Sequence, residues 1–263
     1  MLDREELSAA GHAAHRHTAG LEREIQTEYP GIWQSFDQLR KNPPAQWPDW
    51  CLLPMAAPAS LVANMGEPKY PATIAAMSAI YAWRYARSVY LVEPALLQRL
   101  LTAVPDALDG VDELADLPQW CVYVAEANPS GFLGGVWMHL EYDINTGRPE
   151  LRLLLDTAPE LGLAGLLPLP LYLDRANVTE AIGDYLATGL ASIGRTGANV
   201  RGGELDASVA QLAERVDGYL ALARYLSRQE ADVQSLTVSS AKPRRYRSPV
   251  KDKEIWLVGY GDA

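Results

Sequence analysis

The stretch at residues 117–157 constrains the fold of this chain more than any other, and it reads LPQWCVYVAEANPSGFLGGVWMHLEYDINTGRPELRLLLDT. Residues 120–124 are rich in aromatic and β-branched side chains, which is typical of a strand. Apolar and polar residues alternate over 135–143, and leucines alternate over 150–156, as in strands whose two faces differ. The sequence NTG at 145–147 provides a hairpin turn between these two segments. The sequence therefore predicts an antiparallel meander of three strands.

Further helices and strands are predicted on both sides of the meander. Helical patterns or caps predict six helices, at residues 3–29, 32–40, 72–91, 94–104, 177–190 and 205–226. The segment LLPLPLYL at 166–173 predicts an edge strand, because alternating prolines can point their missing N–H groups away from the ladder. IWLVGY at 255–260 predicts a last strand that returns to the sheet. The predicted fold class is α+β, with a small antiparallel sheet, made of the meander and the C-terminal strand, packed with several helices.

The length and the local composition predict a helical extension followed by one domain. The chain has 263 residues, enough for one large domain. Residues 1–45 form the predicted helical N-terminal extension, whose low apolar content suggests that it is exposed, frayed or used against a partner. Residues 46–263 form the predicted single α+β domain, which includes a basic segment at 242–253. A Pro-rich connection at 42–71 carries enough Trp and Leu to wrap around the surface of this domain.

Charge is distributed unevenly along the chain. The net charge of −10 argues against non-specific nucleic-acid binding over the whole surface. The segment at 242–253, KPRRYRSPVKDK, holds six Lys or Arg residues and one Asp, which gives it a charge of +5. Arg244, Arg245 and Arg247 are candidates for contacts with RNA phosphates, and Tyr246 for stacking on a base. The same segment could equally be a solvated loop or dock on an acidic partner.

The residue types that usually carry catalysis or bind metals do not form a recognisable site. Three of the four histidines, His12, His15 and His17, are close in sequence but do not share one helix face, so we predict neither a metal site nor a cofactor. A hydrolase that uses Cys121 and His139 is a further hypothesis. The alternative is that Cys121 is a buried structural thiol. The start of the chain lacks an apolar signal segment, and no run is long enough to span a membrane. We therefore expect a cytoplasmic protein without a membrane partner and without catalytic residues.

The strand at 135–143 has two different faces. If Val136, Met138 and Leu140 point into the core, then Trp137, His139 and Glu141 point to the other side, where Cys121 and Tyr123 can join them. An aromatic sheet face with a polar rim can hold a peptide. The alternative is that a helix covers this face.

Several segments of the chain resemble a known family. LPQWCVYV at 117–124, VWMHLEYDI at 136–144 and the Leu-rich segment that ends at Asp156 resemble the core of the type V-A anti-CRISPR family whose member suppresses biosynthesis of the type V-A CRISPR nuclease. IYAWRYARSVYLVEP at 80–94 resembles a helix of that family that has a similar aromatic and Arg pattern. The resemblance extends over roughly residues 70–263.

The resemblance implies a function without catalysis. It implies a protein of phages, plasmids or other mobile elements that recognises a polypeptide, namely the nascent N-terminal part of the CRISPR nuclease, and lowers its production. Trp83 and Arg87 of the similar helix then join Tyr123, Trp137, His139 and Glu141 as candidate partner-binding residues. It also implies that the basic segment at 242–253 lies near RNA or the ribosome. The alternative function is an RNA-associated regulator that acts through this segment.

Overall fold

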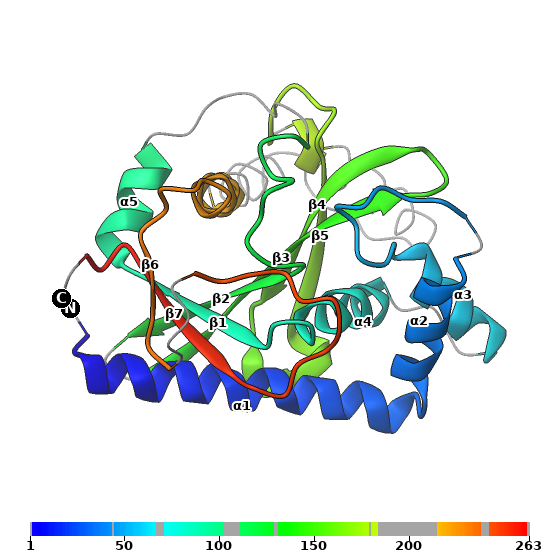
Figure 1. The fold of residues 1–263 in the computed structure, drawn as a ribbon, viewed down its shortest axis with the longest axis horizontal. Helices are drawn as coiled ribbons and strands as arrows, with labels where there is room; N and C mark the ends of the chain where they lie inside the picture. The colour runs from blue at the N-terminus through cyan, green and yellow to red at the C-terminus, as the bar shows by residue number, and fades with distance from the viewer. Residues whose placement is uncertain are drawn as a thin grey trace, which may run out of the picture.

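The computed structural model describes most of the chain, namely residues 2–43, 45–66, 71–102, 111–128, 131–178, 180–183, 215–237 and 242–261. At its centre is a mixed sheet of seven strands in the order β5-β4-β3-β2-β1-β7-β6 (Figure 1). The strands are β1 (Ser88–Val92), β2 (Val122–Asn128), β3 (Gly131–Asp143), β4 (Arg148–Asp156), β5 (Leu166–Tyr172), β6 (Val233–Ser235) and β7 (Glu254–Val258). Helices lie on both sides of this sheet, so both of its faces are buried.

One half of the sheet is the predicted meander, extended by β5. The pairs β2–β3, β3–β4 and β4–β5 are all antiparallel, and β7 returns to the sheet beside β1, as predicted. β5 forms one edge of the sheet, also as predicted. The N–H of Leu173 donates to the carbonyl of Pro149 at the end of β4 (3.0 Å). In an antiparallel pair, the backbone N–H groups of every second residue before Leu173 therefore also point towards β4. The backbone nitrogens of Pro168 and Pro170 therefore point away from β4, towards the free edge of the sheet. Because these nitrogens carry no hydrogen, this edge is a weaker template for another strand.

The other half of the sheet differs from the prediction. β1 is parallel to both β2 and β7, and β6 pairs with β7, so the sheet is larger than a small antiparallel one and is partly parallel. The class α+β stands. The helix predicted at 72–91 ends at Trp83, and its last residues belong to β1 instead. β1 is buried on both faces, and a strand of this kind shows no alternation that distinguishes it from a buried helix.

Several helices pack around the sheet. In the order of the chain, they are α1 (Arg4–Glu28), α2 (Ile32–Lys41), α3 (Ala56–Asn64), α4 (Pro71–Trp83) and α5 (Pro94–Thr102), with a 3-10 helix η1 (Pro159–Gly165). Residues 215–226 are helical, as are those described within 178–183, while the rest of the helices predicted at 177–190 and 205–226 lies outside the described residues. None of the helices in the described ranges combines the length and apolarity that crossing a bilayer requires.

α1 runs along one face of the sheet, and the expectation of an exposed or frayed N-terminal helix is wrong (Figure 1). Asp3 caps the helix, because its carboxylate accepts hydrogen bonds from the N–H groups of Glu5 and Glu6 (both 2.9 Å). One stripe of the helix is buried, and it consists of Leu7, Ala10, Gly11, Ala14, His15, Thr18, Leu21 and Ile25. This stripe shares a core with α4 and the sheet. The small residues in it lower the apparent apolarity of the sequence while they allow close packing.

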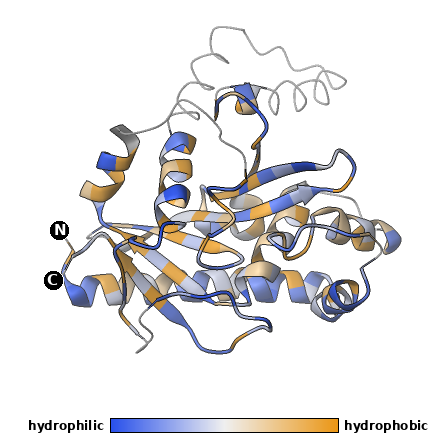
Figure 2. Ribbon diagram, turned by 45° about the horizontal axis from the view of Figure 1, so that its top comes forward, coloured by the Kyte–Doolittle hydropathy of each residue, from blue (hydrophilic) through white to orange (hydrophobic). Residues whose placement is uncertain are grey.

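The opposite face of the sheet packs against the helical residues 215–226. Val136, Met138 and Leu140 of β3 lie in this second core, as predicted. Leucines of β4 and β5 join them, together with Val216 and Leu220 of the helical segment. Figure 2 shows the hydrophobic residues of the strands between the helices on either side.

Candidate functional site

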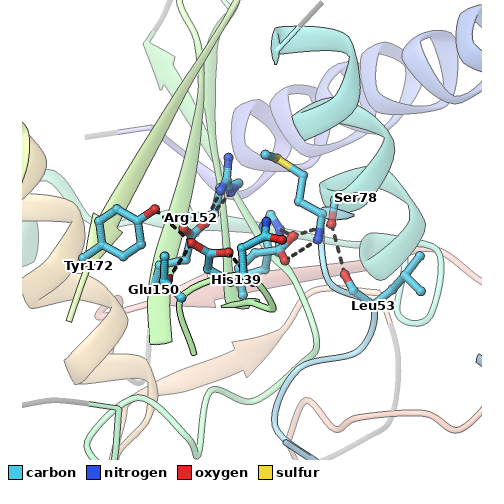
Figure 3. A network of polar contacts seen from close by, with 11 residues as sticks. Leu53, Ser78, His139, Glu150, Arg152 and Tyr172 are labelled. Atoms are coloured by element: carbon cyan, nitrogen blue, oxygen red, sulfur yellow. Dashed lines mark hydrogen bonds and ion pairs between the residues drawn. The ribbon is translucent and has the colours of Figure 1, made fainter. Parts of the chain in front are cut away.

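A cluster of charged side chains is buried at the end of the sheet face that α4 covers (Figure 3). The register between β3 and β4 places Glu141 directly opposite Glu150, and His139 directly opposite Arg152. Their residues are between 1% and 6% exposed. Two carboxylates that face each other across neighbouring strands repel, so the arrangement needs compensating cations and hydrogen-bond donors.

Glu141 connects three separate parts of the chain. Its Oε2 accepts a hydrogen bond from the backbone N–H of Met55 (2.9 Å), just before α3. Its Oε1 accepts from His139 Nε2 (2.9 Å) and from the hydroxyl of Ser78 on α4. Burial alone would raise the pKa of Glu141, but the hydrogen bond and charge of His139, with Arg152 and Ser78, lower it. Glu141 is therefore held as a carboxylate inside the protein.

Arg152 supplies the positive charge of the cluster. Its Nε donates to Glu150 Oε1 (2.7 Å), and a second guanidinium nitrogen donates to the same oxygen. Burial acts to lower the pKa of Arg152, yet the charges of Glu150 and Glu141 outweigh burial and raise it. The pKa of Glu150 is raised, because burial and the nearby Glu141 outweigh its ion pair with Arg152. One guanidinium is thus shared between two carboxylates, and Glu150 is the less compensated of the two.

A pocket of about 280 Å³ opens onto this cluster. Its lining combines the charged side chains with an apolar wall from α3 and the hairpin that joins β3 to β4, and consists of Met55, Ala56, Ala59, Glu141, Tyr142, Asp143, Ile144, Asn145, Glu150, Arg152 and Tyr172. Three carboxylates and one guanidinium line the pocket, so its charge is negative when all of them are ionised. A cavity of this size and charge suits a cationic side chain better than an anion.

Helices cover the aromatic sheet face, which is the alternative to an open peptide-binding face that the sequence left unresolved. The sides were assigned correctly, since Tyr123 and Trp137 share a core on the face opposite Val136. Both rings are fully buried beneath α1 and α4, with centroids 4.1 Å apart. The Tyr123 hydroxyl donates to Asp156 Oδ2 (3.2 Å). Alternation shows which residues share a face, but it does not show whether a distant helix covers that face.

The predicted partner-binding residues lie in different environments: one lines a pocket, and others make internal contacts. Glu141 lines the pocket described above, whereas Trp83 is fully buried and donates from Nε1 to the carbonyl of Ser88 (2.8 Å). Arg87 forms an ion pair with Glu22 of α1 (2.7 Å) and donates to the carbonyl of Val250 (2.8 Å). Trp83 and Arg87 thus fix internal contacts between α1, the start of β1 and the segment before β7.

The residues of the basic segment at 242–253 fall into two groups. Arg245 donates to the carbonyls of Leu117 (2.9 Å) and Ala115, and its guanidinium lies 5.0 Å from the centre of the Trp120 ring. Tyr246 donates from its hydroxyl to Glu254 (3.0 Å). These two residues anchor the segment to the domain. Arg244 and Arg247, in contrast, are exposed.

A second pocket lies beside this anchored segment. Its volume is about 580 Å³, and it is lined by Arg40, Pro43, Ala45, Gln46, Trp47, Pro48, Asp49, Cys51, Leu52 and Trp120. The lining comes mainly from the Pro-rich connection, which packs its Trp and Leu residues against the domain as expected. Trp120 belongs to both features, because its indole Nε1 donates to the carbonyl of Tyr246 (2.8 Å).

The Cys121–His139 hydrolase hypothesis is contradicted. Cys121 is fully buried, and burial raises the pKa of its thiol well above the usual value, which disfavours a reactive thiolate. His139 is also buried and donates to Glu141 rather than to a thiol. Cys51 is likewise a buried free thiol. Over the described ranges, no three His, Cys, Asp or Glu side chains are arranged to hold a metal ion.

Sequence reasoning missed Ser78, Glu150 and Arg152 of the charged cluster. Glu150 and Arg152 alternate with the leucines of β4, so their shared face could have been recognised from the same period-two pattern. Their pairing with Glu141 and His139 follows from the hairpin turn. Ser78 carries no such signal, because a serine inside an apolar helix has no distinctive spacing.

Comparisons with known proteins agree with this fold. The model of the AcrVA2-like family, described as the anti-CRISPR type V subtype A2 family, matches residues 90–261. A solved structure described as the crystal structure of AcrVA2 aligns with a TM-score of 0.59 over 93% of this chain and 84% of that chain, at 16% identity. At this identity the alignment shows a shared fold. No curated protein matches the chain.

Proposed function

Because this chain belongs to the AcrVA2-like anti-CRISPR type V subtype A2 family, we propose that it is a non-enzymatic protein of a phage or plasmid that recognises a polypeptide target and lowers its production. The family match carries this proposal. It covers residues 90–261, which include β2, β3, β4 and β5 and most of the lining of the acidic pocket. The target is the nascent chain of a CRISPR nuclease, which the protein meets in the bacterial cytoplasm, where translation takes place.

The acidic pocket supports a contact with a polypeptide. Its lining places Glu141, Asp143 and Glu150 around a space of about 280 Å³, with Met55 and Ala59 on the apolar side. A Lys or Arg side chain has an apolar stem and a cationic end, and this combination fits such a lining. We therefore assign this pocket to a basic residue of the target.

The test is co-expression with a type V-A nuclease in bacteria that carry the matching CRISPR system. The nuclease, its mRNA and the nascent chains captured by the tagged protein are measured together. The proposal expects less nuclease protein, less of its mRNA and recovery of its N-terminal fragments. Unchanged nuclease and mRNA, with no fragment recovered, would contradict the proposed function.

A matched pair of variants on α3 tests the pocket itself. Ala59 lines the pocket, so Ala59→Arg should fill it with a competing positive charge and abolish capture of the target. Ser60 is the next residue on the helix and is exposed outside the lining, so Ser60→Arg should leave capture unchanged. If Ala59→Arg captures the target like the unmodified protein, the contact lies elsewhere even though the function stands.

A further inference from the structure

The larger pocket is lined by tryptophans, and one of them also supports the basic segment at 242–253. The indole rings of Trp47 and Trp120 line a space of about 580 Å³, and Arg40 lines it as well. Trp120 also forms the support of the basic segment, because Arg245 lies over its ring and the carbonyl of Tyr246 accepts its N–H. Trp120 therefore connects the aromatic pocket to the basic segment at 242–253, and we call the pocket and the segment together the tryptophan surface.

The charge of the tryptophan surface differs from that of the rest of the molecule. The segment at 242–253 carries +5 while the whole chain carries −10, so the remainder carries −15. Arg245 is used internally, but Arg244, Arg247 and Lys251 are exposed. A positive segment on an acidic body attracts an anion locally, and the acidic remainder disfavours binding along the whole surface.

We propose that the tryptophan surface binds a short stretch of single-stranded RNA. Surfaces of this kind combine cations for the phosphates with aromatic rings on which unpaired bases stack. Here Arg244 and Arg247 face the phosphates, and Trp47 offers its ring to a base in the pocket. Paired bases are not available for such stacking, so duplex RNA binds less well. This inference goes beyond the proposed polypeptide contact and uses different residues.

The aromatic rings decide between RNA and an acidic polypeptide. An acidic peptide would use the exposed arginines but would have no need of the indole of Trp47. RNA binding requires both groups, since stacking contributes affinity in addition to charge. A substitution of Trp47 therefore separates the two partners, while a substitution of the arginines does not.

The first experiment measures the binding of a fluorescently labelled 12-nucleotide RNA of mixed sequence, by anisotropy, over a series of salt concentrations. Each phosphate contact with a single strand contributes about 0.7 to the slope of log affinity against log salt. Arg244→Glu with Arg247→Glu should weaken binding at least tenfold and reduce the slope by about 1.4. The matched control changes two exposed arginines of α1, Arg4→Glu with Arg16→Glu, and should retain the slope of the unmodified protein.

The second experiment changes the pocket. Trp47→Ala should weaken RNA binding by about fivefold or more, and Trp47→Phe should retain most of it because the phenyl ring still stacks. Thermal melting of both variants shows that they are folded. Unchanged RNA affinity in the arginine pair or in Trp47→Ala would overturn the proposal. The proposal would also be overturned if the protein did not bind the RNA but bound a Glu-rich peptide, and if Trp47→Ala left that peptide binding unchanged.

Discussion

His15 is an imidazole of α1 enclosed by the sheet, with a residue exposure of 1%. Its Nε2 donates to the carbonyl of Glu254 (2.9 Å), and its Nδ1 has no hydrogen-bond partner among the described residues. Burial lowers the pKa of His15 from 6.5 to about 4, against the opposing effect of the hydrogen bond to Glu254. Below pH 6.5 the unfolded chain therefore binds a proton that the folded protein excludes.

The stability that neutral His15 contributes is complete above pH 6.5 and is lost as the pH falls towards 4. The free energy of unfolding should decrease by about 3 kcal/mol over this interval because of this residue. His15→Gln retains a donor without a titrating group, so its stability should fall less steeply over the same interval. Urea unfolding at several pH values measures the difference. His12→Gln, at an exposed position of the same helix, should follow the unmodified protein, and parallel curves for His15→Gln would refute the assignment.

Arg152 compensates the charge of the two opposed carboxylates in the charged cluster. Arg152→Met keeps much of the side-chain volume but leaves Glu141 and Glu150 buried beside each other without the guanidinium. Breaking a buried ion pair in this way should lower the free energy of unfolding by about 3–5 kcal/mol. Adding Glu150→Gln to Arg152→Met removes the repulsion and should recover much of the loss. Urea unfolding of the single and double variants measures both effects, and a loss below about 1 kcal/mol for Arg152→Met would contradict this role.

Residue-level patterns in the sequence predicted the sides of β3 but not their surroundings. Val136 and its alternate neighbours enter one core, and Trp137 enters the other. The alternation could not show that α1, more than 100 residues earlier in the chain, covers Trp137. The charged cluster was likewise unpredictable as a unit, because its hydrogen bonds to Met55 and Ser78 depend on how α3 and α4 meet the sheet.

At the level of elements, the two glycines of α1 have different structural roles. A Cβ atom added to Gly11 would lie 2.8 Å from the side chain of Ile255 on β7, whereas one added to Gly20 would meet nothing within 4 Å. Alanine favours a helix over glycine by about 1 kcal/mol at either position. At Gly11 this gain is opposed by overpacking against β7, which typically costs about 1–3 kcal/mol.

The two substitutions should therefore have opposite effects on stability. Gly20→Ala should raise the free energy of unfolding by about 0.5–1 kcal/mol. Gly11→Ala should lower it, with a net loss of up to about 2 kcal/mol. Thermal and urea unfolding of the two variants provide the comparison. An equal increase in both would mean that β7 moves aside easily and that α1 is not held by close packing.

Some elements could be predicted from the sequence and others could not, for physical reasons. The meander has short turns and clear alternation, and β5 carries outward-facing prolines, so local chemistry identified them. β1 is parallel and buried on both faces, and its apolar run continues from α4 after only a few residues. β6 has three residues and is defined by its pairing with β7. Parallel pairing joins segments far apart in the chain, and local patterns contain little information about it.

At the level of the whole molecule, the region that matches the family does not include the helices that cover one face of the sheet. The match begins at residue 90, inside β1, whereas α1, α2, α3 and α4 precede it. These helices nevertheless bury one face of the sheet, and the structural alignment with AcrVA2 extends over 93% of the chain. The N-terminal helices are therefore part of the fold that positions both pockets.

Removal of residues 1–30 tests whether α1 is a structural layer or a separable extension. The truncation would expose Tyr123, Trp137 and the apolar face around them, so the remaining chain should lose cooperative unfolding and bind a hydrophobic dye. Near-ultraviolet circular dichroism and calorimetry provide the measurement. A synthetic peptide of residues 1–30, added in trans, should restore the spectrum of Trp137 and its neighbours, because the capped helix supplies the missing stripe. A truncated chain that melts cooperatively near the temperature of the full chain would show instead that α1 is dispensable for the fold.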